Sequence, residues 1–181
     1  MSVAMTTTGQ ALSWEEYERL PEDPRVEYVD GHLVVSPGPT RRHRIIGARL
    51  WTALEAATPA THETNLAWSW KPGRDEFIPD VTVYPLDEVA GSDARFTGTP
   101  ALVVEVLSSN RGDDLVRKVG KYAAAGLPHH WILDPRDRTL EAFVLQDGTY
   151  APAARLDEAA PVGQLDLGIA RVTLDLAELL R

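Results

Sequence analysis

The sequence predicts an α/β fold, in which a mixed β-sheet is flanked by helices and carries an N-terminal β-hairpin. Three observations predict it. Two short apolar runs flank Asp30-Gly31, a dipeptide that favours a tight hairpin turn. Residues 101–107 form a nearly continuous apolar run, which is typical of a strand covered on both faces. Segments with helical spacing alternate with these strand candidates, and this order favours helices packed on the faces of a sheet.

The N-terminal half opens with a helix signal followed by the hairpin. Ser13 is expected as the N-cap of a short helix, with Glu16 closing a capping box. The polar residues before it, 1–12, are expected to be a disordered leader. The other elements expected in this half are a hairpin pairing 26–29 with 32–35, a helix over 42–57, and strands over 66–70 and 77–84.

The C-terminal half is expected to begin with a loop over 85–99, followed by the apolar strand. A second helix over 113–125 is expected to stop at Gly126, with Pro128 just beyond it. We therefore expect one domain over residues 13–181. The remaining expected elements are a strand over 130–134, a hairpin from 140 to 150 turning at 147–148, and a tail over 172–180 that alternates and then turns helical.

Composition narrows the function classes. The chain has 181 residues, 44% of them hydrophobic, and no cysteine, which excludes disulfides, thiolate zinc sites and cysteine nucleophiles. No run approaches the roughly 18 apolar residues of a membrane span, so no membrane partner is expected. The absence of cysteine suits a reducing compartment, and a cytoplasmic location is expected. The net charge of −9 weighs against nucleic acid as a partner, because phosphate binding normally uses Lys and Arg. Acidic residues gathered in one cleft would, however, suit a divalent cation.

Glu105 is the most informative residue, because every other residue of the run 101–107 is apolar. A carboxylate inside a covered strand loses its hydration, and pairing, hydrogen bonds or a metal must offset that loss. Ser108 follows closely, so Glu105 lies near the carboxyl end of its strand, where α/β sheets place their ligands. A structural glutamate that is paired with an arginine, or protonated, fits the same pattern.

Asp80 opens the run 80–84 directly after Pro79. Alone, it is equally well explained as a turn-forming aspartate before a strand. Together with Glu105 it suggests more, because two carboxylates on neighbouring strands can share one Mg²⁺. Such a cation activates water and stabilises charge that builds on phosphorus.

Four further residues are weaker candidates. Lys118 lies on the helix after Glu105 and is expected to reach the metal site; the alternative is a surface lysine paired with Asp114, whose removal would cost only a few tenths of a kcal/mol. Glu27 is either a third acidic ligand or an exposed hairpin charge. Arg42 and His43 belong to a basic cluster that either contacts phosphate or forms a solvated turn.

His129 and His130 are adjacent in a predicted strand. Neighbouring residues of a strand point to opposite faces, so the two rings cannot easily share one ion. Both are expected to be structural.

Ordered blocks along the chain make it resemble the Uma-two family, a bacterial branch of the PD-(D/E)xK nuclease superfamily. The resemblance runs from about Ser13 to near the C-terminus. It rests on Trp14 to Tyr17, Glu27 to Pro37, His43, Pro79 to Val81, Val104 to Ser108, Asp114-Leu115 with Lys118 and Tyr122, Ala125 to Pro128, Trp131 and Asp134-Pro135.

This resemblance implies a restriction-endonuclease-like fold and an Asp…Glu-x-Lys site that binds Mg²⁺ or Mn²⁺ and cuts phosphodiesters. Asp80 and Glu105 match the aspartate and glutamate of that motif. The motif lysine falls at Leu107, and the resemblance maps its role onto Lys118. His129-His130 also departs from relatives, which usually have Glu-Tyr there. The implied partners are nucleic acid, DNA in the first place, and a second copy of the chain in a homodimer.

Two functional hypotheses follow. The first is a metal-dependent endonuclease that uses Asp80, Glu105 and Lys118. The second is a non-catalytic module that keeps the nuclease fold and binds nucleic acid or a protein. The intact acidic pair favours the first hypothesis, whereas the acidic charge and Leu107 favour the second.

Overall fold

The computed structural model describes residues 6–20, 23, 26–36, 38–89, 95–108 and 112–181. Its elements follow the predicted alternation of strands and helices, which confirms the α/β class. In order they are β1 (Thr6–Ala11), α1 (Trp14–Tyr17), β2 (Val26–Val29), β3 (His32–Val35), α2 (Arg41–Ala57), β4 (His62–Leu66), β5 (Ser69–Trp70), β6 (Val81–Pro85), the 3₁₀ helix η1 (Leu86–Glu88), β7 (Arg95–Phe96), β8 (Leu102–Val106), α3 (Gly112–Ala124), β9 (His129–Asp134), β10 (Thr139–Gln146), β11 (Thr149–Leu156), β12 (Val162–Asp166), β13 (Arg171–Asp175) and α4 (Leu176–Leu180).

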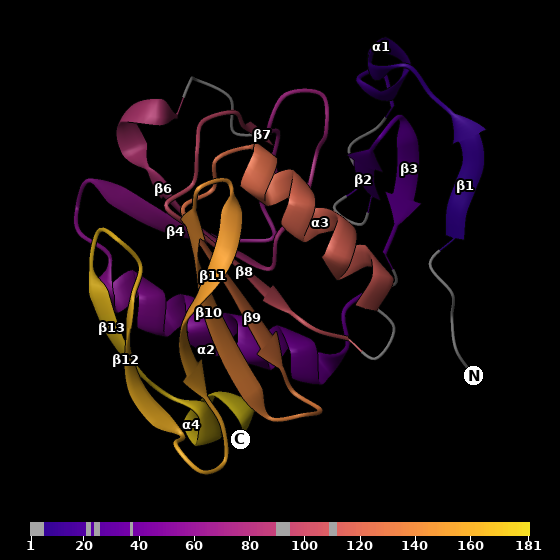
Figure 1. Ribbon diagram of the computed structural model, residues 1–181. Helices are drawn as coiled ribbons and strands as arrows, with labels where there is room; N and C mark the ends of the chain where they lie inside the picture. Colours follow the sequence, from indigo (N-terminus) through magenta and orange to yellow (C-terminus); the bar gives the residue numbers. More distant parts are fainter. Residues whose placement is uncertain (1–5, 21–22, 24–25, 37, 90–94, 109–111) are drawn as a thin grey trace.

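A mixed sheet of six strands forms the centre of the molecule, in the order β11-β10-β9-β8-β6-β4. Strands β8 and β9 are parallel, and the other neighbouring strands of this sheet are antiparallel. The parallel pair needs a crossover, which α3 provides between the two strands (Figure 1). All five residues of β8 are buried, as expected for a strand covered on both faces.

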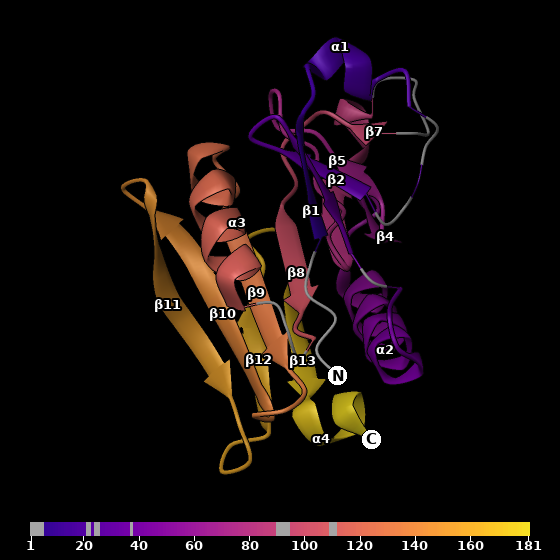
Figure 2. The ribbon, with the colours of Figure 1, turned by 90° about the vertical axis from the view of Figure 1, so that its right-hand side faces the viewer.

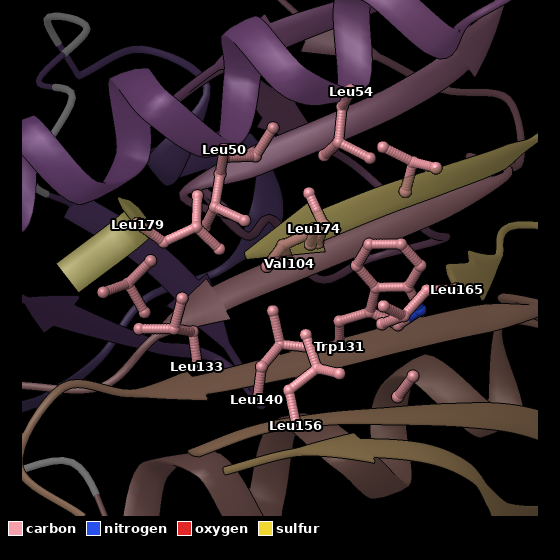
Figure 3. Close-up of a cluster of buried hydrophobic side chains, with 14 of the residues drawn as sticks. Leu50, Leu54, Val104, Trp131, Leu133, Leu140, Leu156, Leu165, Leu174 and Leu179 are labelled. Carbon is pink, nitrogen blue, oxygen red and sulfur yellow. The ribbon is translucent and has the colours of Figure 1, made fainter. Parts of the chain in front are cut away.

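Helices α2 and α3 lie on opposite faces of this sheet (Figure 2). A hydrophobic cluster of buried side chains fills the space on each face. On one face, Leu50 and Leu54 of α2 pack with Val104, and the β12–β13 hairpin and α4 complete the cover (Figure 3). On the other face, Tyr122 of α3 packs with Val103 and with aromatic residues that include Trp70. Because α2 and α3 lie on opposite faces, the carboxyl end of β8 is reached by side chains from both.

The N-terminal hairpin forms as predicted. Strands β2 and β3 pair in antiparallel register, and Asp30 and Gly31 both have positive φ, 52° and 78°, as a type I′ turn requires. Ser13 caps α1 in the predicted capping box with Glu16. The hairpin therefore has a fixed geometry, and this matters because it carries Glu27.

The predicted disordered leader is wrong for Thr6–Ala11. This segment forms strand β1 and pairs antiparallel with β3. The unpaired edge of a hairpin strand offers backbone hydrogen bonds to any extended segment, and a Thr-rich run has good strand propensity. Residues 1–5 lie outside the described residues.

The boundaries of several other strands also differ from the predicted ones. The predicted strand 77–84 begins only at Val81, and strand β4 begins at His62, before the predicted start at 66. Strand β12 was not predicted, because it contains Gly163 and only two apolar residues, Val162 and Leu165. The predicted loop 85–99 contains η1 and β7, and its residues 90–94 lie outside the described part. No helix among the described residues has the length and apolar character of a membrane span.

Candidate active site

Glu105 lies at the carboxyl end of β8 and is almost fully buried, with 3% of its surface exposed. Its Oε1 accepts a hydrogen bond from the Tyr122 hydroxyl at 2.7 Å. The same oxygen lies 3.4 Å from the Lys118 Nζ. Both donors come from α3, so this helix holds the Glu105 carboxylate in position.

Lys118 joins Glu105 to the N-terminal hairpin. It is 3% exposed, and its Nζ donates to Glu27 Oε1 at 2.7 Å. That oxygen also accepts the backbone N–H of Ile78 at 2.8 Å. Lys118 is therefore not the surface lysine that the sequence also allowed, and the side chain of Asp114, its supposed partner, lies outside the described residues.

Glu27, Glu105 and Lys118, together called here the buried ionic cluster, contain two carboxylates and one ammonium. Glu27 is 3% exposed, so the alternative of an exposed hairpin charge is wrong. Its second oxygen, Oε2, is buried and has no hydrogen-bond partner among the described residues. A buried carboxylate oxygen without a partner is costly, unless a cation or water supplies the missing interaction.

Asp80 stands just before β6, beside the end of β8. Its Oδ2 accepts the backbone N–H of Val106 at 2.8 Å. Strands β6 and β8 pair Thr82 with Val103 and Val81 with Val104. Continued by one residue, this antiparallel register sets Asp80 opposite Glu105, and directly opposed residues have Cβ atoms about 4.5–5.5 Å apart. The backbone register thus brings Asp80 beside Glu105. The Glu105 carboxylate contacts residues of α3, whereas the Asp80 carboxylate contacts His43 of α2.

His43 reaches the same point from α2. Its Nε2 lies 3.0 Å from the carbonyl oxygen of Val106 and 3.2 Å from Asp80 Oδ2. With 12% of its side chain exposed, His43 is not part of a solvated turn. Its contacts are with Asp80 and the backbone of β8, so it positions the aspartate.

Arg42, the neighbouring candidate, remains exposed, and its guanidinium lies 3.5 Å from the carbonyl oxygen of Pro135. It lines a cleft of about 780 Å³ that also includes His43 and Leu107. Leu107 is the position of the missing motif lysine, so the cleft adjoins the end of β8.

His130 behaves as the structural residue that its strand position predicted. It is 1% exposed, and neither ring nitrogen has a hydrogen-bond partner among the described residues. Its ring packs edge-on against Tyr122, with centroids 5.2 Å apart. Burial, and to a smaller extent the Lys118 ammonium, lowers the pKa of His130 to about 3.

The role of the Tyr122 hydroxyl was not predicted from the sequence, where Tyr122 is named only among the residues that carry the family resemblance. Its ring is fully buried among aromatic residues. A tyrosine at a fully buried helix position needs a partner for its hydroxyl, and that requirement was the available signal. The contact between His43 and Asp80 had no comparable signal, because the two lie on elements that are distant in the sequence.

The donor set fits a hard divalent cation. Oxygen ligands from one or two carboxylates are what Mg²⁺ and Mn²⁺ use, and the register of β6 and β8, continued by one residue, brings the backbone of Asp80 beside that of Glu105. Glu27 adds a buried carboxylate oxygen with no protein partner among the described residues. Within the part of the chain that the structure describes, no three His, Asp or Glu side chains already stand as a complete ligand group. Water and phosphate oxygens would therefore have to complete the coordination.

Comparisons with known proteins show the family and the fold of the chain. The model of the Uma2 family, described as "Putative restriction endonuclease", matches residues 14–176. Among solved structures, the chain is similar to one described as a "putative nuclease belonging to DUF820 from Anabaena variabilis ATCC 29413". That match has a TM-score of 0.77 and 17% sequence identity, and it covers 93% of this chain and 97% of the other. Curated proteins gave no match.

Proposed function

Since the chain belongs to the Uma2 family of restriction-endonuclease-like proteins, we propose that it is a Mg²⁺- or Mn²⁺-dependent endonuclease that hydrolyses phosphodiester bonds of nucleic acid. The observation that carries this proposal is the 3.4 Å approach of Lys118 Nζ to Glu105 Oε1. In the PD-(D/E)xK pattern a lysine accompanies the acidic pair, but the position of that lysine is occupied by Leu107 in this chain. A lysine that reaches the same glutamate from α3 supports an intact set of groups.

Each residue has a distinct part in the proposed reaction. Asp80 and Glu105 would hold the cation, with Glu27 as a further acidic group. When bound, a divalent cation supplies Lewis-acid activation of water and neutralises charge on the phosphoryl oxygens. Lys118 and Tyr122 donate to Glu105, which fixes this carboxylate in position.

His43 and Lys118 prepare the site before substrate arrives. His43 fixes Asp80 through its contact at 3.2 Å, while its other contact ties it to the backbone of β8. Lys118 places one positive charge beside the carboxylates, where charge would build on a substrate phosphate. Fixed groups of this kind need not reorganise during the reaction, which is the main source of electrostatic catalysis.

Metal binding is testable without any substrate. Added Mn²⁺ is expected to raise the melting temperature of the wild type, because a ligand that binds only the folded state stabilises it, by about 2.7 kcal/mol at a hundredfold excess over Kd. In Asp80→Asn combined with Glu105→Gln, the shift should disappear. Asp87→Asn, an exposed acidic residue on η1, is the control and should keep the full shift. Equal shifts in the wild type and the double variant would mean that the metal binds elsewhere.

Cleavage tests the activity itself. Nicking of plasmid DNA and cutting of single-stranded DNA and RNA oligonucleotides are measured with Mg²⁺ or Mn²⁺ at low salt. Asp80→Asn is expected to lower the cleavage rate about 100-fold or more, since it removes a charge from the site of electrostatic stabilisation. Asp87→Asn should cleave at the wild-type rate. Absence of cleavage by the wild type with either metal would reject the enzyme in favour of a non-catalytic nuclease-fold module.

A further inference from the structure

The cleft beside the candidate active site is formed by two segments that are far apart in sequence. The first turn of α2 supplies one wall, and the turn between β9 and β10 supplies the other. Leu107 and Ser108, directly after β8, form part of the lining. His43 belongs to the cleft and also contacts Asp80, so the cleft continues to the candidate metal ligands.

The lining of this cleft is basic in a chain that is acidic overall. Arg42, Arg136 and Arg138 line it together with His43, and Asp134 is the one acidic residue among the described lining residues. Asp134 Oδ1 accepts hydrogen bonds from the backbone N–H groups of Arg136 and Asp137, at 2.8 and 3.1 Å, so this carboxylate stabilises the turn between β9 and β10. Arg138 has one acidic neighbour outside the lining, Glu158 at 2.6 Å, and that side chain is 72% exposed. The whole chain has 18 basic and 27 acidic residues, so this concentration of arginine is not a consequence of composition.

Helix α2 points its positive end at the same cleft. Its first turn contains Arg41 to Arg44 and no acidic residue, although acidic residues are the ones that stabilise a helix N-terminus. Side-chain cations at this end are repelled by the helix dipole and by one another. A bound anion would relieve both repulsions, and backbone N–H groups at a helix N-terminus favour anions as well.

We propose that this cleft binds the phosphodiester backbone of the nucleic acid next to the bond that is cut, with Arg42, Arg136 and Arg138 as phosphate contacts. The inference rests on the proposed function and adds the surface that binds its substrate. Arginine presents a planar, bidentate donor that matches phosphate oxygens. Leu107 and Pro135 provide apolar surface beside the arginines, which suits the sugar of a nucleotide. A continuous backbone can contact both walls at once, which a single small anion cannot.

The test is the salt dependence of oligonucleotide binding without added metal and with a chelator, so that no cleavage occurs. Each phosphate contact that is lost reduces the slope of log Kobs against log salt by about 0.7 for a single strand. Arg136→Ala combined with Arg138→Ala is therefore expected to reduce the slope by about 1.4. The matched control is Arg155→Ala combined with Arg171→Ala, which removes the same charge from exposed positions on β11 and β13. Its slope should equal that of the wild type.

Equal slopes for the cleft variant and the control variant would overturn the inference, as would no measurable binding by the wild type at the lowest salt. A strong preference for a 5′-phosphorylated over a 5′-hydroxyl oligonucleotide would also overturn it, because the cleft would then recognise a terminal phosphate. Asp80→Asn separates the two proposals. Loss of cleavage in this variant with an unchanged slope supports both. If the wild type cleaves but the cleft variant and the control variant have equal slopes, only the proposal about the cleft is rejected. If the slopes are as expected but the wild type does not cleave, only the proposed enzymatic function is rejected.

Discussion

Replacing Lys118 with methionine is expected to lower the free energy of unfolding by about 3–5 kcal/mol, because it leaves Glu27 and Glu105 as buried charges without their ammonium partner. Methionine keeps most of the side-chain volume, so the loss would report the charge and not a cavity. The measurement is chemical denaturation at neutral pH. The cost of a few tenths of a kcal/mol applied to the alternative of a surface lysine, whereas Lys118 is buried.

Two further variants identify the cause of that loss. Lys118→Met combined with Glu27→Gln should recover part of the stability, because one of the unpaired charges is removed as well. Lys121→Met, three residues further along α3, should cost about 1 kcal/mol or less, since Lys121 pairs with Asp30 and Asp75 at a more exposed position. If Lys118→Met unfolds within about 1 kcal/mol of the wild type, the buried ionic cluster does not exist in solution.

Acid should destabilise the protein through His130 more than through an ordinary histidine. The ring has a pKa near 6.5 when unfolded and about 3 when folded, so the unfolded state takes up its proton first. The stability contribution of the neutral ring is fully present above pH 6.5. It is lost progressively as the pH falls towards 3, at about 1.4 kcal/mol per unit, which amounts to about 2–3 kcal/mol near pH 4.5.

His130→Phe isolates this effect, because phenylalanine keeps the ring contacts with Tyr122 and Tyr150 and cannot be protonated. At neutral pH the variant is expected to be more stable by about 1–3 kcal/mol, since it removes two buried nitrogens that have no hydrogen-bond partner within the described part of the chain. The gain should increase between pH 6.5 and 4.5 when unfolding is followed across that range. His62→Asn, on the outermost strand β4, is the control. A gain that does not grow with acidity would mean that His130 is hydrated in the native state.

The fold could be predicted from the sequence because its main elements depend on local patterns of residues. The Asp30-Gly31 turn, the stripe of α2 and the apolar strand with Glu105 each depend on residues close together in the chain, and all three were correct. Strand β1 was not predicted, because its formation depends on an open edge of β3 that no local pattern shows. Packing partners supplied by distant segments are the part that a single sequence does not contain.

The same distinction explains the candidate site. Glu105 was recognisable because a lone carboxylate in an apolar strand contradicts its surroundings. Glu27 and His43 were ambiguous, because their neighbours in sequence are ordinary for a hairpin and a helix start. Their roles depend on contacts with segments that are distant in the sequence and that meet the hairpin and α2 around the end of β8.

The pairing of Glu27 with Lys118 also has a consequence for how the chain acquires its site. The two residues are 91 positions apart, so their contact closes a long loop. Closing this loop costs conformational entropy before the contact itself contributes any stability. Contacts of such long range slow folding and are completed only after the intervening segments have found their places. A chain that is still emerging from the ribosome, with its N-terminal hairpin already formed, cannot assemble the buried ionic cluster until α3 has been synthesised and docked.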